Sequence, residues 1–165
     1  MKKTISLLLL IVSLTFLFSG CVRLEKLPEE MPENFKFYVE WGYSRSFYDS
    51  FSGTLKKAYG ESTKYIMSED ELKNVYALIR DMKIECYDDE LHGLEFQQAD
   101  PCMDIRLSVC AGKISKTVEA QDVWDLSGGK SLRCKRFFET VSKIVAILES
   151  TDEWKSLPPD PNVYY

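Results

Sequence analysis

The sequence predicts an α+β fold in which a largely antiparallel sheet carries two helices on one face. Apolar and polar residues alternate with period two in several short segments, which is typical of half-buried strands. Two longer segments repeat apolar residues every three or four positions, as amphipathic helices do. Short turn-like stretches separate neighbouring strands, so antiparallel pairing is expected. The predicted order is β-β-α-β-β-α in a single domain, and 165 residues suit one domain.

The first predicted strand, residues 35–41, alternates aromatic and valine residues with Lys, Tyr and Glu. Residues 42–53 are rich in Ser, Asp, Arg and Gly and are expected to form a long loop. A strand-like pattern resumes over residues 54–59, which favours a hairpin. Tyr65 and Met67 either extend that second strand or begin another.

The first predicted helix begins after Ser68. Ser68 at the N-cap and Glu71 three residues later match the capping-box pattern. Arg80 and Lys83 suit the last turn, where cations interact favourably with the helix dipole. The apolar stripe consists of Leu72, Val75, Tyr76, Ile79 and Met82.

The second half repeats the same element order. An acidic, irregular stretch over residues 87–101 is expected to be a surface loop. Residues 103–109 and 114–120 alternate as strands around a tight turn at Ala111-Gly112-Lys113. A long apolar stripe from Leu132 to Leu148 predicts the last helix, and the Pro-rich tail, residues 158–165, cannot continue a helix.

The first twenty residues have the features of an export signal. Lys2 and Lys3 precede an apolar run of twelve residues, Leu7 to Phe18, broken only by Ser and Thr. That run is too short for a membrane span, which needs roughly 20 residues, and it fits a signal peptide. Small residues then precede Cys21, as in a bacterial lipobox. We therefore expect cleavage before Cys21 and lipidation of its thiol; the alternative is an ordinary secretory signal with an incidental cysteine.

Between Cys21 and the domain lies a segment rich in Pro and Glu. The composition of residues 21–34 favours an extended, flexible tether of at most about 40 Å. The alternative is that part of this segment packs on the domain. Removing the signal, which has two Lys and no acid, changes the net charge from −5 to −7, so the domain, residues 35–157, is expected to stand away from anionic lipid.

Three motifs of the chain resemble those of a group of small bacterial lipoproteins of uncharacterised function. The group shares a lipobox, a Phe/Trp-rich first strand, a YDSFSG-like loop and a TDEWKSLP-like segment. Besides the lipobox that ends at Cys21, these are residues 35–41, 48–53 and 151–158. The resemblance implies a fold more than an activity, because the group brings no catalytic residues. The lipobox predicts a place in the cell envelope, and Val22 after the cysteine is compatible with either the plasma or the outer membrane.

No catalytic or metal-binding pattern is visible. His92 is the one histidine and lies in an acidic run, without the ligand spacing of zinc or EF-hand sites. No nucleophile elbow, dinucleotide or phosphate-binding motif occurs, so no cofactor and no metal are expected. The acidic balance argues against a nucleic-acid partner. A hydrolase that uses His92 and nearby acids remains an alternative, as does a purely structural envelope protein.

Four cysteines follow Cys21 in a chain expected to be exported, which permits disulfides. Cys102 and Cys110 would lie about 26 Å apart on one strand, too far to be bridged. The remaining pairings are Cys102–Cys134 with Cys86–Cys110, which strand topology favours, and Cys86–Cys102 with Cys110–Cys134. Four reduced thiols are the alternative to both.

The candidate binding surface is an aromatic stretch in the predicted loop. Tyr and Arg side chains supply large contact area and hydrogen bonds in interfaces. The alternative is that these rings fold back and seal the core. The candidate residues are Tyr43, Arg45, Phe47, Tyr48 and Phe51. The leading hypothesis is a membrane-anchored, extracytoplasmic binding module, without catalysis, for an envelope protein or a glycan.

Replacing Cys21 tests the predicted anchor. Cys21→Ser should block lipidation, because serine lacks the thiol that would accept the diacylglyceryl group. The variant should remain unprocessed or be secreted, and intact-mass measurement alongside a detergent phase partition should show no acyl groups. A wild-type mature chain that begins elsewhere, or carries no acyl groups, would contradict the prediction.

Overall fold

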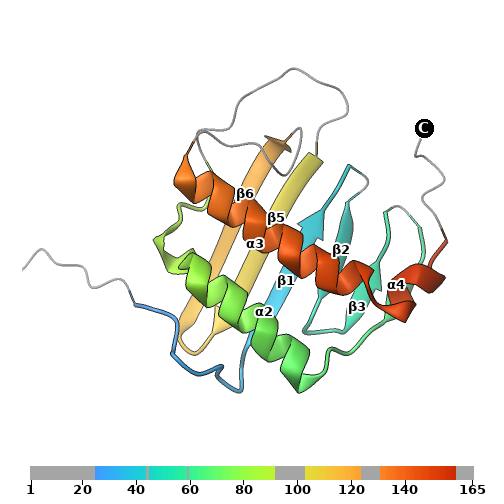
Figure 1. The fold of residues 1–165 in the computed structure, drawn as a ribbon, viewed down its shortest axis with the longest axis horizontal. Helices are drawn as coiled ribbons and strands as arrows, with labels where there is room; N and C mark the ends of the chain where they lie inside the picture. The colour runs from blue at the N-terminus through green and yellow to red at the C-terminus, as the bar shows by residue number, and fades with distance from the viewer. Residues whose placement is uncertain (1–24, 44, 59, 92–102, 124–130, 159–165) are drawn as a thin grey trace, which may run out of the picture.

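The strands form one antiparallel sheet in the order β4-β3-β2-β1-β5-β6. The computed structural model describes residues 25–43, 45–58, 60–91, 103–123 and 131–158. Helices α2 and α3 cross one face of the sheet (Figure 1). The elements are β1 (Lys36–Trp41), β2 (Ser46–Asp49), β3 (Thr54–Lys56), β4 (Ser62–Lys64), α2 (Glu69–Met82), a 3-10 turn (Ile84–Cys86), β5 (Met103–Ala111), β6 (Ile114–Val123), α3 (Leu132–Glu149) and α4 (Asp152–Ser156).

The predicted fold class, an antiparallel sheet with two substantial helices on one face, is confirmed. The number of strands before α2 is four rather than two. Strand β2 lies inside the stretch that was expected to be a loop, and β4 is separate from β3. Ser46 helps this short strand to form, because its hydroxyl accepts a hydrogen bond from the Ala58 backbone at 2.9 Å.

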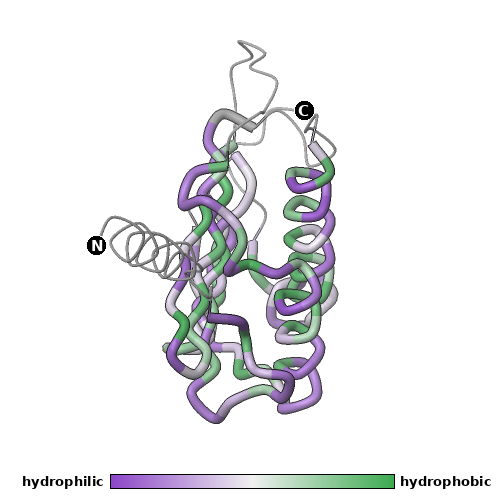
Figure 2. Tube along the Cα trace, turned by 90° about the vertical axis from the view of Figure 1, so that its left-hand side faces the viewer, coloured by the Kyte–Doolittle hydropathy of each residue, from purple (hydrophilic) through white to green (hydrophobic). Residues whose placement is uncertain are grey.

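The core lies between the sheet and the helices, which form two layers (Figure 2). Alternate residues of β1 and β5 point into this space, as the period of two requires. Their apolar side chains meet the buried stripes of α2 and α3. Fully buried members include Val39, Val75, Ile79, Leu107, Phe137 and Phe138.

Helix α2 begins with the predicted capping box. The Ser68 hydroxyl accepts a hydrogen bond from the Glu71 backbone, and the Glu71 carboxylate accepts one from the Ser68 backbone at 2.8 Å. The Tyr65 hydroxyl also donates to Glu71 at 2.6 Å, and this bond is the main reason why the pKa of Glu71 is lowered. The helix ends where Lys83 adopts a left-handed conformation with φ of 61°.

The second half follows the predicted strand-turn-strand-helix order. Gly112 closes the tight turn between β5 and β6 with φ of 62°. Ser131 caps α3 by accepting a hydrogen bond from the Cys134 backbone at 3.1 Å. Helix α4 was not predicted, although Thr151 caps it and acids occupy its first turn. It ends at Ser156, because the residue before a proline, here Leu157 before Pro158, disfavours the helical conformation.

The prediction of a flexible tether is wrong over residues 25–34, which pack on the domain as the alternative foresaw. Leu27 is only 7% exposed and belongs to the core. The Tyr76 hydroxyl donates to the Pro28 carbonyl at 2.6 Å. Asn34 pairs with the backbone of Gly112 through two hydrogen bonds of 2.9 and 2.8 Å. The segment therefore runs beside α2 and the β5–β6 turn before it enters β1 (Figure 1).

Leu27→Ala should destabilise the domain by about 2 kcal/mol, because it removes buried methyl groups and leaves a cavity. Glu30→Ala on the same segment is the control, since Glu30 is exposed and its loss should change stability by less than about 0.5 kcal/mol. Urea unfolding measures both changes. Equal, negligible effects of the two variants would mean that the segment is not docked.

Candidate binding surface

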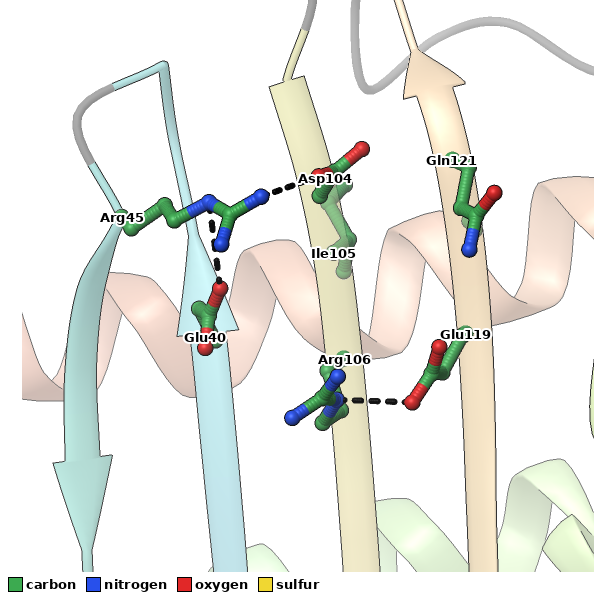
Figure 3. A pocket seen from close by; sticks show the side chains of 8 residues that line it. Glu40, Arg45, Asp104, Ile105, Arg106, Glu119 and Gln121 are labelled. Atoms are coloured by element: carbon green, nitrogen blue, oxygen red, sulfur yellow. Dashed lines mark hydrogen bonds and ion pairs between the residues drawn. The ribbon is translucent and has the colours of Figure 1, made fainter.

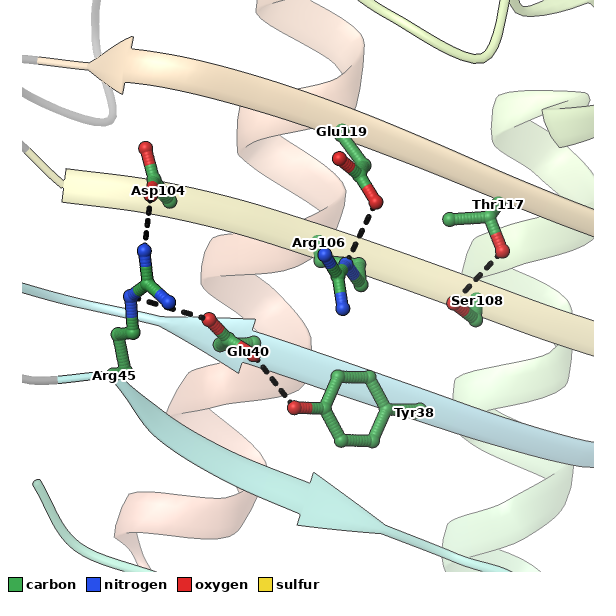
Figure 4. A network of polar contacts seen from close by, with 8 residues as sticks. All are labelled: Tyr38, Glu40, Arg45, Asp104, Arg106, Ser108, Thr117 and Glu119. Carbon is green, nitrogen blue, oxygen red and sulfur yellow. Dashed lines mark hydrogen bonds and ion pairs between the residues drawn. The ribbon is translucent and has the colours of Figure 1, made fainter.

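The face of the sheet opposite the helices is uncovered among the described residues. The same alternation that buries Phe37 and Val39 turns the intervening residues of β1 outward, and β5 and β6 behave alike. We call this surface the outer face. It carries charged, aromatic and hydroxyl side chains, including Tyr38, Glu40, Arg106, Ser108, Thr117 and Glu119 (Figure 4).

Strand register aligns the outer-face side chains in a row across five strands. Lys56 lies opposite Phe47, and Phe47 lies opposite Glu40. Glu40 in turn lies opposite Arg106, and Arg106 opposite Glu119. The row therefore alternates in charge from Glu40 to Arg106 to Glu119. The Arg106 Nε and Glu119 Oε1 atoms form an ion pair at 2.8 Å.

Arg45 closes one end of a shallow hollow on the outer face (Figure 3). Its guanidinium Nη2 lies 2.8 Å from Asp104 Oδ2, and its Nε lies 3.8 Å from Glu40 Oε1. Arg106 and Gln121 complete the lining from β5 and β6. The hollow thus presents two guanidinium groups among carboxylates.

The backbone of Arg45 is held in the left-handed region, with φ of 54°. An L-residue in this conformation costs roughly 1–2 kcal/mol relative to glycine, which adopts it freely. The turn Gly42–Ser46 places the arginine here, with the Arg45 backbone donating to the Gly42 carbonyl at 3.2 Å. Strained residues of this kind concentrate at functional sites, and this one carries the guanidinium that bridges two strands.

Tyr38 and Phe47 stiffen the centre of the outer face. Their ring centroids lie 5.6 Å apart with planes 28° from parallel, and the Lys56 ammonium lies 5.9 Å from the Phe47 ring centre. The Tyr38 hydroxyl donates to Glu40 at 2.6 Å. Burial and the Glu40 carboxylate raise the pKa of Tyr38, so this hydroxyl stays protonated and remains a donor. Both aromatic rings therefore contact neighbouring side chains, and they do not form an open surface on which a ligand could stack.

The aromatic stretch predicted as a binding surface divides between three locations. Tyr48 is wrong as a surface residue, because it is only 1% exposed and packs in the core. Arg45 and Phe47 lie on the outer face. Tyr43 and Phe51 are exposed in the turns at opposite ends of β2. The cause is β2 itself, whose alternation sends neighbouring rings to opposite faces.

The cysteines of the described residues do not form the favoured bridge. Cys86 and Cys110 are free, exposed thiols, so the Cys86–Cys110 bridge is absent, and both bridges of the other pairing, Cys86–Cys102 and Cys110–Cys134, are wrong for the same reason. Cys110 points to the outer face of β5, whereas Cys86 follows α2 in the helix layer. Cys134 is buried, and its sulfur lies 3.1 Å from the Ser131 hydroxyl. Cys102 lies outside the described residues, so the Cys102–Cys134 bridge stays a prediction.

His92 also lies outside the described residues, so the hydrolase alternative stays untested. The acids just before it form ion pairs: Asp89 with Lys116 at 2.6 Å and Asp88 with Arg133 at 3.7 Å. Their backbone runs beside β6, where the Leu91 backbone donates to the Glu119 carbonyl at 2.8 Å. Within residues 25–91, 103–123 and 131–158, apart from positions 44 and 59, no group of three or more His, Cys, Asp or Glu could hold a metal ion.

Sequence reasoning missed most of the outer-face residues. The available signal was the polar half of the alternating strands, at Tyr38 and Glu40 and again at Asp104 and Arg106. A solvated sheet face has the same pattern, so the pattern alone does not indicate a site. The connection of Arg45 to Asp104 joins residues 59 positions apart and depends on strand order.

The chain matches no protein-family model, and no curated protein is significantly similar to it in sequence. Among the helices of the described residues, none has the length and apolar character needed to cross a membrane.

Arg45→Gly should leave the domain about 1 kcal/mol more stable than Arg45→Ala, because both lose the surface ion pairs but only alanine keeps the left-handed strain. Thermal or urea unfolding of the two variants gives the difference directly. If the alanine variant were as stable as the glycine variant, the left-handed conformation at Arg45 would be contradicted.

Proposed function

We propose that this protein is a lipid-anchored, extracytoplasmic binding module whose outer face binds another envelope protein. The observation that carries the proposal is the sheet face that the described residues leave uncovered, with its charge-alternating row and the hollow at Arg45. The sequence of residues 1–21 supports the envelope location through its signal-like run and lipobox-like cysteine. This arrangement of mutually paired charges suits the binding of a partner better than catalysis.

A polypeptide partner fits the exposed guanidinium groups best. Side chains of Arg45 and Arg106 are 62% and 48% exposed, and each guanidinium has five N–H donors. The ion pairs with Asp104, Glu40 and Glu119 leave further donors on both. Those donors suit the carbonyl and carboxylate groups of a protein surface, for which Arg and Tyr are the preferred contact residues.

A glycan is the less suited partner. Sugar rings stack on open aromatic faces, whereas Phe47 is already in contact with the Tyr38 ring and the Lys56 ammonium. The Tyr38 hydroxyl is likewise engaged with Glu40. The charged groups of the hollow outnumber its neutral polar groups, which favours a partner that carries charges of both signs.

Affinity capture with a face variant tests the proposal. The mature, lipidated chain is immobilised, envelope proteins in detergent are passed over it, and each captured partner is titrated for its Kd. The variant Phe47→Ala with Arg106→Ala should weaken a specific partner roughly ten-fold or more, because central aromatic and arginine contacts carry most interface energy.

The matched control is Lys135→Ala with Arg136→Ala, which alters exposed basic residues of α3 in the helix layer. This control should bind the partner as the wild type does. Tyr48 is left unchanged in both variants because it belongs to the core. Unchanged binding by the face variant, or equal losses in both variants, would overturn the outer face as the binding surface.

A further inference from the structure

We propose that one edge of the sheet rests on the lipid bilayer and inserts Phe51 and Ile66 into it. This inference rests on the proposed lipid anchor and specifies how the domain sits on it. Two observations lead to it: the docked course of residues 25–34, and the position of the most exposed apolar side chains.

The docked segment shortens the connection between Cys21 and the domain. Residues 22–24 alone separate Cys21 from Glu25, the first described residue. Four Cα steps of at most about 3.6 Å reach roughly 15 Å. A headgroup layer is itself roughly 5–8 Å thick on each side of a bilayer. The docked segment on a lipidated Cys21 therefore begins within about 10 Å of the headgroup layer, much closer than the expected 40 Å tether would have allowed.

The docked segment leads into a definite edge of the sheet. Strand β1 begins there at Lys36, which pairs with Cys110 near the end of β5. Strand β2 ends there, since the Ser50 backbone donates to the Phe37 carbonyl at 3.0 Å. Strand β4 ends there as well, because Lys64 lies opposite Thr54 at the start of β3. We call this end of the sheet, where these strands begin or end, the anchor edge. It lies at the bottom of the sheet in Figure 1.

Phe51 and Ile66 both lie on the anchor edge, in the segments that meet at Gly53. They are 79% and 83% exposed, the two highest values among the large apolar side chains of the described residues. Gly53 connects them: its carbonyl accepts a hydrogen bond from the Tyr65 backbone at 2.9 Å, and Ile66 would lie 3.4 Å from a Cβ at Gly53. Exposed apolar residues at this point suit insertion between lipid headgroups and acyl chains.

Lysines flank this apolar pair. The Lys36 ammonium lies 5.9 Å from the Phe51 ring centre, and the Lys64 ammonium donates to the Ser52 carbonyl at 2.7 Å. Lysine side chains beside inserted rings reach back to lipid phosphates, which gives each an attraction to an anionic surface. The acids of this region are engaged: Asp49 accepts hydrogen bonds from the Phe51 backbone at 2.9 Å and the Ser52 hydroxyl at 2.7 Å, and Glu69 is paired with Lys73 at 2.7 Å.

Tryptophan placed at the edge reports insertion. Mature, lipidated chains with Ile66→Trp or Leu132→Trp are reconstituted in vesicles of phosphatidylethanolamine and phosphatidylglycerol, with and without bromine on the acyl chains of the lipid. Leu132 is the matched control because it is 67% exposed and begins α3 at the opposite end of the sheet (Figure 1). Fluorescence of the wild-type chain, which has three tryptophans, is subtracted.

Brominated lipid should lower the added fluorescence of Ile66→Trp about two-fold or more, since bromine quenches only rings that enter the bilayer, whereas Leu132→Trp should be unchanged. A further Phe51→Ser change in the Ile66→Trp chain should reduce that quenching. Intact mass of each preparation reports the acyl groups on Cys21.

The outcomes separate the two proposals. An acylated chain in which Ile66→Trp is quenched no more than Leu132→Trp overturns the edge contact and leaves the anchor standing. A chain without acyl groups overturns the anchor, and the edge contact falls with it. Quenching of both tryptophans to the same extent also overturns the edge contact, because the domain would then have no fixed orientation.

Discussion

The rest of the structure depends on the burial of one face of a six-stranded sheet by two helices. Helices α2 and α3 meet the inward-facing residues of β1 and β5, and the side chains completely removed from water lie in this layer. A strand cannot bury one set of alternate residues without turning the other set outward. The polar outer face, with its aligned row from Lys56 to Glu119, is therefore a direct consequence of the core.

Contacts between strands that are distant in sequence fix the positions of side chains on the outer face. Arg45 follows β1 yet pairs with Asp104 of β5, and its left-handed backbone aims the guanidinium across β1. Surface ion pairs of this kind add little stability, typically below about 1 kcal/mol each. Their effect here is to hold two guanidinium groups at fixed positions, which reduces the entropy lost when a partner binds.

The sequence predicted elements whose signals are local and missed those that depend on tertiary contacts. The capping box at Ser68 and the alternation of β5 are complete within a few residues, and both predictions are confirmed. Strand β2 has only four residues between turn-forming ones, so its period of two was too short to recognise. Residues 25–34 have the composition of a linker, and they are docked by tertiary contacts: the burial of Leu27, the hydrogen bond from Tyr76 of α2 to Pro28, and the pairing of Asn34 with the β5–β6 turn.

The two proposals fit together through the direction of the strands. With the anchor edge at the bilayer, β1 rises from the membrane, and Glu40 lies about 13 Å beyond Lys36 at roughly 3.3 Å per residue. The hollow at Arg45 then stands above the headgroups, and the sheet is upright. Its outer face is then perpendicular to the plane of the bilayer, and neither the lipid nor the helix layer covers it. A partner held at the same membrane can meet this face by lateral diffusion, and an oriented domain loses less rotational freedom on binding than one on a long tether.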